Sequence, residues 1–368
     1  MSYIETQSQG LQVQTANQKL LHSELQSLLR TLSISPTDLQ PLRDASLSNP
    51  DKLSEAEYAL STLYKAMLMI DPDIRQNKKR LVDAAGEHSS VGVYADTEIG
   101  QMRAIREKKE EYRTEARMFL RRLGQFMSTG FKVAEHKRIE ASANSPHDSM
   151  KLENGAHGYF RQELWMYNPL MLFARELSAA DWQELIKLYE QQAKAPYQNQ
   201  FRDNNLAWKK AARKPTGEEQ ELLFTHHDKE KENEGITMAA RKLTVRRGKT
   251  IKAAAGLKLG LGDKQNGKLE PYEAFSGTLR ETLNSMFEEQ NFVVQFFHLN
   301  SLVNADFPDL VASARPDERH CPDFSARQSH DPDREMSKKV EQIMDELFSF
   351  WPNEMQSLVD WAISADPL

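Results

Sequence analysis

A long charged segment, from about Thr97 to Ala143, constrains the fold of this chain more than any other feature. Its apolar side chains recur at alternating intervals of four and three residues, at Tyr112, Ala116, Phe119, Leu123, Phe126 and Gly130. That spacing places one side chain per turn on a single narrow stripe of a helix. No proline interrupts the segment, and at ~1.5 Å per residue such a helix is roughly 70 Å long. Globular helices usually run ~8–20 residues, so the segment predicts a rod that separates or joins parts of an assembly.

The composition fits a helical chain of two or three domains. Hydrophobic residues make up 39% of the 368 residues and charged residues 28%, which allows apolar cores beneath a well-solvated surface. The 16 glycines and 15 prolines form a smaller share of the chain than the ~12% that these two residue types make up in an average protein. No convincing run of alternating strand residues occurs. We therefore expect an all-α fold: an elongated rod of helical bundles with a long amphipathic helix and a long irregular basic loop.

Charge and cysteine content argue against several classes of protein. A net charge of −6 disfavours a chain whose whole surface binds nucleic acid, so no specific nucleic-acid partner is expected. The single cysteine, Cys321, cannot form a disulfide within the chain, and a reducing cytoplasm is the default. No apolar run approaches the ~20 residues that cross a bilayer, and the polar N-terminus lacks a signal-peptide core. These features predict a soluble cytoplasmic protein with no transmembrane segment.

Polar breaks and caps predict how the chain is divided. The expected parts are a helical region ending in the charged rod at 1–143, a linker at 144–158, and a second helical bundle at 159–368 with irregular insertions at 215–270 and 306–330. The capping box that starts at Ser54 predicts a helix beginning there. Pro196 is expected to separate two helices of the second bundle.

Two apolar seams are candidate partner interfaces. The first lies near the N-terminus, at Leu21, Leu25, Leu28 and Leu32. The second lies in the charged rod, at Tyr112, Phe119, Leu123 and Phe126. An apolar stripe at helical spacing is usually part of a domain's own core. The stripe of the rod fits two arrangements, packing against a partner chain and packing against other helices of this chain. Few short helices would cover its full length, so the sequence does not decide between them.

A basic tract in the first insertion is the candidate site for an anionic partner. Its leading cations are Arg241, Lys242, Arg246, Arg247, Lys249 and Lys252. Clusters of this kind attract anionic lipid headgroups at ~1 kcal/mol per cation, and they also attract RNA or acidic protein tails. A module that binds anionic lipid or RNA through residues 241–268 is therefore an alternative function, and a solvated loop without a partner is the simpler interpretation.

Motifs of catalysis and metal binding are incomplete. Gly262 to Lys268 has the G-x-x-x-x-G-K spacing of a phosphate-binding loop, but Leu269 follows where a Ser or Thr reaches magnesium. A nucleotide-dependent enzyme using Lys268 is therefore a weak alternative. His320, Cys321 and His330 fall short of the four regularly spaced ligands of structural zinc. We expect no catalytic residue, no cofactor and no metal.

Short stretches along nearly the whole chain resemble the fungal form of the exocyst subunit family Sec3. They occur in the same order, at Leu25–Leu29, Ser33–Leu39, Leu63–Leu68, Met102–Lys109, Pro169–Glu176, Lys214–Phe224, Leu269–Phe275, Glu289–Val294 and Leu358–Ala362. The resemblance implies a non-catalytic subunit of an eight-subunit complex that holds secretory vesicles at the plasma membrane before fusion. Its members are rods of helical bundles that pack side by side through long helices. The implied partners are other exocyst subunits, and the implied location is the cytoplasm, peripheral at plasma-membrane sites of secretion. An anionic membrane surface is a further candidate partner, which follows from the cations of the basic loop and not from the resemblance.

The resemblance covers the central helical region of the family. The family's N-terminal domain, which binds phosphoinositide and Rho-type GTPases, has no counterpart before Met1, and its further C-terminal bundles have none after Leu368. Binding of membranes and GTPases through that domain is therefore not expected of this sequence.

Overall fold

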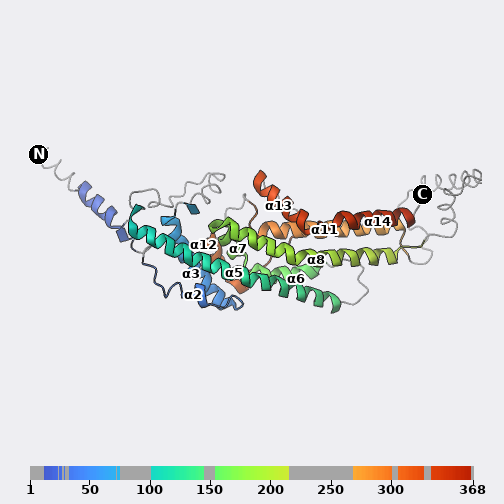
Figure 1. Cartoon of the computed structure of the whole chain (residues 1–368), viewed down its shortest axis with the longest axis horizontal. Coiled ribbons are helices and arrows are strands. Elements are labelled where there is room, and N and C mark those ends of the chain that lie inside the picture. Colours follow the sequence, from blue (N-terminus) through green and yellow to red (C-terminus); the bar gives the residue numbers. More distant parts are fainter. Residues whose placement is uncertain are drawn as a thin grey trace, which may run out of the picture. The chain divides into compact units, whose positions relative to one another are not determined.

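A computed structural model describes residues 12–23, 25–26, 29, 33–71, 73–74, 101–144, 154–214, 268–300, 306–326 and 333–365. Every regular element within those ranges is helical, and an isolated bridge joins Ala212 to Leu269. The predicted all-α class is confirmed. Residues 12–23 are helical, and the helices that follow (Figure 1) are α2 (Gln40–Asp44), α3 (Pro50–Ile70), α5 (Arg103–Asn144), α6 (Asn154–Trp165), α7 (Asn168–Leu177), α8 (Ala179–Ala211), α11 (Pro271–Phe296), α12 (Phe307–Ser313), the 3-10 turn η2 (Pro316–Glu318), α13 (Arg334–Leu347) and α14 (Trp351–Ala365).

The described residues group into two compact units. Unit 1 draws on the described residues of 1–145, 154–196 and 286–347, and unit 2 on those of 197–285 and 348–368. The two units do not follow the order of the chain as the sequence-based division does, because α8 and α11 each contribute residues to both of them.

An aromatic cluster forms the centre of unit 1. Tyr64 of α3 meets Phe173 of α7 at 6.2 Å between ring centroids and Phe307 of α12 at 5.7 Å. Phe119 of α5 contacts the same Phe173 at 6.2 Å. All four side chains are at most 1% exposed. Aromatic pairs at such spacings contribute about 0.5–1.5 kcal/mol beyond the area that they bury, so one core holds four helices together.

Helix α3 begins four residues before the expected start at Ser54. The side chain of Asn49 accepts hydrogen bonds from the backbone N–H groups of Asp51, at 2.9 Å, and Lys52, at 3.3 Å. Pro50 then occupies the first turn, where its missing N–H costs nothing. This earlier cap satisfies the first orphan donors of the helix, so the capping-box motif lies inside α3.

Other boundaries also differ from the sequence-based expectation. α8 continues through Pro196, where a break was expected. A proline inside a helix removes one hydrogen bond, but Ala193 and Tyr197 on either side are both 4% exposed, and their packing keeps the chain helical. The expected irregular stretch at 306–330 contains α12 and η2, because Phe307 is drawn into the core of unit 1.

The long charged helix is present as α5, with 42 residues from Arg103 to Asn144. Its length is therefore ~63 Å at ~1.5 Å per residue. Residues 97–100 of the predicted rod lie outside the described ranges. α6, which starts at Asn154, contacts α5, so part of the expected linker at 144–158 is helical.

Phe201 of α8 lies at the centre of unit 2. It stacks on Phe348, with ring centroids 5.7 Å apart, and meets Phe350 and Trp351 edge-on. Farther along α8, the indole Nε1 of Trp208 donates to Glu281 of α11 at 2.8 Å. The bridge between Ala212 and Leu269 closes this end of the helix pair.

Gly277 of α11 is expected to tolerate no side chain. A Cβ atom built there would lie 2.5 Å from Cη2 of the Trp208 ring, a distance that real Cβ atoms do not show. Gly277→Ala should therefore displace the indole from Glu281 and lower the free energy of unfolding by about 1–3 kcal/mol, the usual cost of overpacking. Urea unfolding followed by tryptophan fluorescence measures this. Gly124→Ala is the control, because no atom lies within 4 Å of the Cβ there; equal effects at the two glycines would contradict the prediction.

Candidate interaction surfaces

The described part of the N-terminal helix carries a row of exposed leucines. Leu21 is 59% exposed and Leu25 is 47% exposed. Leu20 and Leu29 beside them are 62% and 64% exposed. Of these four, Leu21, Leu25 and Leu29 share one side of the helix. Large apolar side chains left in water on one helix face usually mark a contact surface. Leu28 and Leu32, the other two residues of the predicted seam, lie outside the described residues.

The predicted seam of α5 faces the chain's own helices. Tyr112 and Leu123 are fully buried, and Phe119 is 1% exposed. Phe126 is half-buried, and its ring lies 5.4 Å from that of Tyr167. One turn beyond the seam, Phe131 contacts Tyr189 at 5.3 Å. Of the two possibilities that the sequence left open for the rod, this geometry favours internal packing.

This burial changes which substitutions test an interface. An aspartate at Phe119 or Leu123 would place a charge in the core of unit 1, where its desolvation costs several kcal/mol. Such a variant would unfold the unit instead of releasing a partner. The exposed leucines at positions 21 and 25 are the sites where a charge can interrupt a contact and leave the fold intact.

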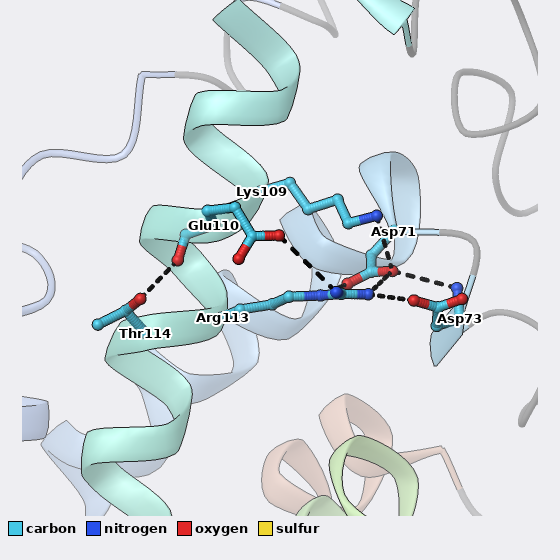
Figure 2. A network of polar contacts seen from close by, with 6 residues as sticks. All are labelled: Asp71, Asp73, Lys109, Glu110, Arg113 and Thr114. Atoms are coloured by element: carbon cyan, nitrogen blue, oxygen red, sulfur yellow. Dashed lines mark hydrogen bonds and ion pairs between the residues drawn. The ribbon is translucent and has the colours of Figure 1, made fainter.

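An ionic cluster joins the end of α3 to α5, and Figure 2 shows the carboxylates of Asp71, Asp73 and Glu110 around the Arg113 guanidinium. The Asp71 carboxylate is fully buried and accepts from Nη2 of Arg113 at 2.7 Å. Lys109 lies 3.7 Å from the same carboxylate, and Asp73 pairs with Arg113 from the solvent side. These carboxylates raise the pKa of the Arg113 guanidinium, and the main cause is the hydrogen bond that Arg113 donates to Asp71. The cluster fixes the position of α5 against the C-terminal end of α3.

Removing the charge of Asp71 should weaken that connection. We expect Asp71→Asn to lower the free energy of unfolding by about 1–3 kcal/mol, because the amide cannot pair with both Arg113 and Lys109. Asp73→Asn is the matched control: its side chain is 67% exposed, and an exposed pair contributes only about 0–1 kcal/mol. Thermal unfolding of the two variants measures how much stability each one loses. Equal losses would show that the buried pair at Asp71 contributes no more than the exposed pair at Asp73.

Two buried arginines connect distant parts of unit 1. Arg161 of α6 donates to Glu289 of α11 at 3.0 Å, and the Tyr189 hydroxyl donates to the same carboxylate. Arg319 pairs with both carboxylate oxygens of Glu57 at 2.7 and 2.8 Å. Neither pair is predictable from the sequence, because the partners lie 128 and 262 residues apart and show no local pattern.

His298 ends α11 with a positive φ of 54°. Its Nε2 lies 3.0 Å from the carbonyl oxygen of Asn168, so this nitrogen carries the proton and donates. In return Asn168 donates to the carbonyl of Gln295 at 3.1 Å, and Arg175 donates to that of His298. Burial lowers the pKa of the imidazole to about 4, and the nearby Arg175 charge acts in the same direction. The neutral ring thus joins the end of α11 to α7, and the Asn168 side chain caps the last carbonyls of α11.

The remaining candidates from the sequence fall largely outside the described residues. All six leading cations of the basic tract lie there, as does most of the G-x-x-x-x-G-K segment. Among the described side chains no group of three His, Cys, Asp or Glu residues is placed to hold a metal ion. Burial raises the pKa of the Cys321 thiol to about 11, which disfavours the thiolate that binds metals. None of the helices within the described ranges has both the length and the apolar character needed to cross a membrane.

Two family models match this chain, one at each end. Residues 1–69 match the coiled-coil region of exocyst complex component Sec3, and residues 296–368 match its C-terminal region. Comparison with curated proteins and with solved structures gave no match.

The described residues of the first matched segment and those of 296–347 in the second lie together in unit 1. Glu57 of the first pairs with Arg319 of the second, and Tyr64 contacts Phe307 across the same boundary. They are therefore parts of one folded core, although the chain between them is long. Two models of one family, matched in order at the two ends of an all-α chain, support a Sec3-like exocyst subunit.

Proposed function

We propose that this protein is a non-enzymatic scaffold subunit of the exocyst. In this role it helps to tether secretory vesicles to the plasma membrane during exocytosis, by packing its helices against those of other exocyst subunits. It works in the cytoplasm, peripherally at plasma-membrane sites of secretion, and uses no cofactor. The family match supports the exocyst assignment, and the exposed leucines support helix packing as the means of contact.

The observation that carries the proposal is the leucine face within the matched coiled-coil region. Leu21 and Leu25 lie one turn apart on one side of the helix, and Leu28 and Leu32 continue the same 4-3-4 spacing in the sequence. That spacing is typical of a helix that packs against another helix over several turns. The described part of this face is exposed to solvent, so a helix of a partner chain is the element expected to bury it.

Charges on this face should release the partner. We expect Leu21→Asp together with Leu25→Asp to weaken association with other exocyst subunits at least about a hundredfold, because each buried leucine contributes about 1.5–3 kcal/mol. The measurement is co-purification of the variant with co-expressed exocyst subunits, with circular dichroism to show that helicity is kept.

A matched variant separates the leucine face from a general effect of charge. Gln26→Asp adds one carboxylate to the same helix, about 140° around the helix from Leu21 and about 100° from Leu25. It should leave co-purification unchanged. Undiminished co-purification of the double leucine variant would contradict the proposal, as would loss of the partner in Gln26→Asp.

A further inference from the structure

The solvent face of α5 changes character along the helix. Near the start of α5 the cations are neutralised by acids of the same helix. Nε of Arg103 lies 2.7 Å from the Glu107 carboxylate, and Nζ of Lys108 lies 2.7 Å from that of Glu111. Pairs of this kind at i,i+3 and i,i+4 are usual on a solvated helix and leave little net charge for a partner.

The middle of α5 has no such neutralisation. Residues 116–134 contain four cations and no acid. Arg122 turns toward α2 and donates to the carbonyl of Leu42. Arg117, Arg121 and Lys132 are exposed, and none of the three has an ion pair or hydrogen bond in the part of the chain that the structure describes. We call these three residues the basic stripe.

The basic stripe is narrow and straight. Arg121 follows Arg117 by four residues and Lys132 follows Arg121 by eleven, spacings that keep the three Cα atoms within about 60° of one another around the helix. The stripe is ~22 Å long at ~1.5 Å per residue. It lies opposite the buried side of α5 that carries Tyr112 and Leu123, so the packing of unit 1 aims it outward.

We propose that the basic stripe binds an acidic helix of a partner protein. The stripe is one side chain wide, which matches a second helix carrying carboxylates at intervals of four and eleven residues. Met118, 46% exposed beside the stripe, offers such a helix an apolar contact. This surface is separate from the leucine face, and the inference goes beyond the tethering proposal because it does not depend on which complex the chain joins.

Other anionic partners fit this surface less well. A lipid surface is held best by cations combined with several aromatic or apolar side chains that enter the headgroup layer. Met118 lies beside the stripe, but Gln125 and Ser128 occupy the positions between Arg121 and Lys132. Single-stranded nucleic acid is held by aromatic rings on which bases stack, and no aromatic residue lies among the exposed residues of 116–134. A helix needs only a line of complementary charge with polar and small apolar contacts along it.

The test uses a synthetic helical peptide as the probe. The peptide has about 20 residues and carries glutamates at intervals of four and eleven; a second peptide has the same composition in scrambled order. Fluorescence anisotropy with the full chain at low salt should show binding to the first peptide at least about tenfold tighter than to the scrambled one. The affinity should fall as salt approaches 0.5 M, where screening shortens the range of such charges to about 4–5 Å.

Charge reversal in the chain supplies the decisive comparison. In the triple variant Arg117→Glu, Arg121→Glu, Lys132→Glu, the affinity for the glutamate peptide should fall at least about tenfold. The same variant should bind a peptide that carries lysines at the same intervals. Lys65→Glu and Lys210→Glu reverse exposed cations elsewhere and should change neither affinity. Unchanged melting temperatures are expected for all of these variants, since each site is solvated.

Three results would overturn the inference. Equal binding of the ordered and scrambled peptides would show attraction without a matched geometry. Binding of phosphatidylserine vesicles or of a single-stranded RNA oligonucleotide, lost in the triple variant while the glutamate peptide does not bind, would assign the stripe to a different partner. Peptide binding that survives the triple variant would place the contact elsewhere on the chain.

Discussion

Replacing Arg319 with methionine should lower the free energy of unfolding by about 3–5 kcal/mol, the usual cost of removing one partner of a buried ion pair. Glu57 is 1% exposed, and burial already raises the pKa of its carboxyl, while Arg319 lowers it. Without the guanidinium, the buried carboxylate loses its ion-pair partner. Arg319 also donates to the carbonyls of Met166, at 2.6 Å, and Ala314, at 3.2 Å, and these acceptors lose their donor as well. Urea unfolding measures the loss.

The neighbouring pair between Arg315 and Asp51 is the matched control. It also joins this segment to α3, but its side chains are 54% and 74% exposed. Arg315→Met should therefore cost only about 0–1 kcal/mol. The double variant Glu57→Leu, Arg319→Met should recover much of the stability, because it leaves no unpaired charge. A cost at Arg319 no greater than at Arg315 would contradict the prediction.

Acidification from about pH 6.5 to pH 4 should destabilise the protein through His298. The folded state holds the pKa of this imidazole at about 4, and an unfolded chain has a histidine pKa of about 6.5. As the pH falls through that interval, the histidine binds a proton in the unfolded state but not in the folded state, so the free energy of unfolding declines. The difference corresponds to ~3.4 kcal/mol at ~1.36 kcal/mol per pKa unit. The contribution is fully present above about pH 6.5.

His298→Asn isolates this contribution from the other titrating groups. Asparagine accepts a positive φ more readily than most residues and does not titrate. The variant should be less stable at pH 7.5, because it loses the hydrogen bond to Asn168. Its free energy of unfolding should also fall less steeply than that of the unchanged chain between pH 6.5 and 4. Urea unfolding at several pH values gives the two slopes, and parallel slopes would show that His298 does not titrate in this range.

Regular spacing is what made parts of this fold predictable from the sequence. The seam from Tyr112 to Phe126 predicted a long amphipathic helix, and α5 is that helix. Absence of strand patterns predicted the all-α class. Caps were less reliable: Ser54 has the expected motif, but Asn49 and Pro50 start α3 earlier, and Pro196 lies inside α8 because both of its flanks pack well. Local signals compete, and packing decides among them.

Contacts between segments far apart in the sequence could not be predicted from local spacing or helix caps. Glu57 and Arg319 each resemble any other charged residue on a helix or in a loop, and only their burial together makes them a pair. The same holds for Asp71 and Arg113. Even the basic stripe, whose lack of acids is visible in the sequence, becomes a candidate surface only once the opposite side of α5 is known to be buried.

The sequence by itself determined that this chain is helical, where its longest helix lies and which family it resembles, because helix periodicity and family motifs are local properties of the chain. Tertiary structure alone decided which apolar stripe is core and which is surface. Both stripes have the same spacing, but the seam of α5 is covered by α7 and its neighbours, whereas Leu21 and Leu25 have no such cover in the described part of the chain. Burial depends on what packs against a helix, and that cannot be read from the helix itself.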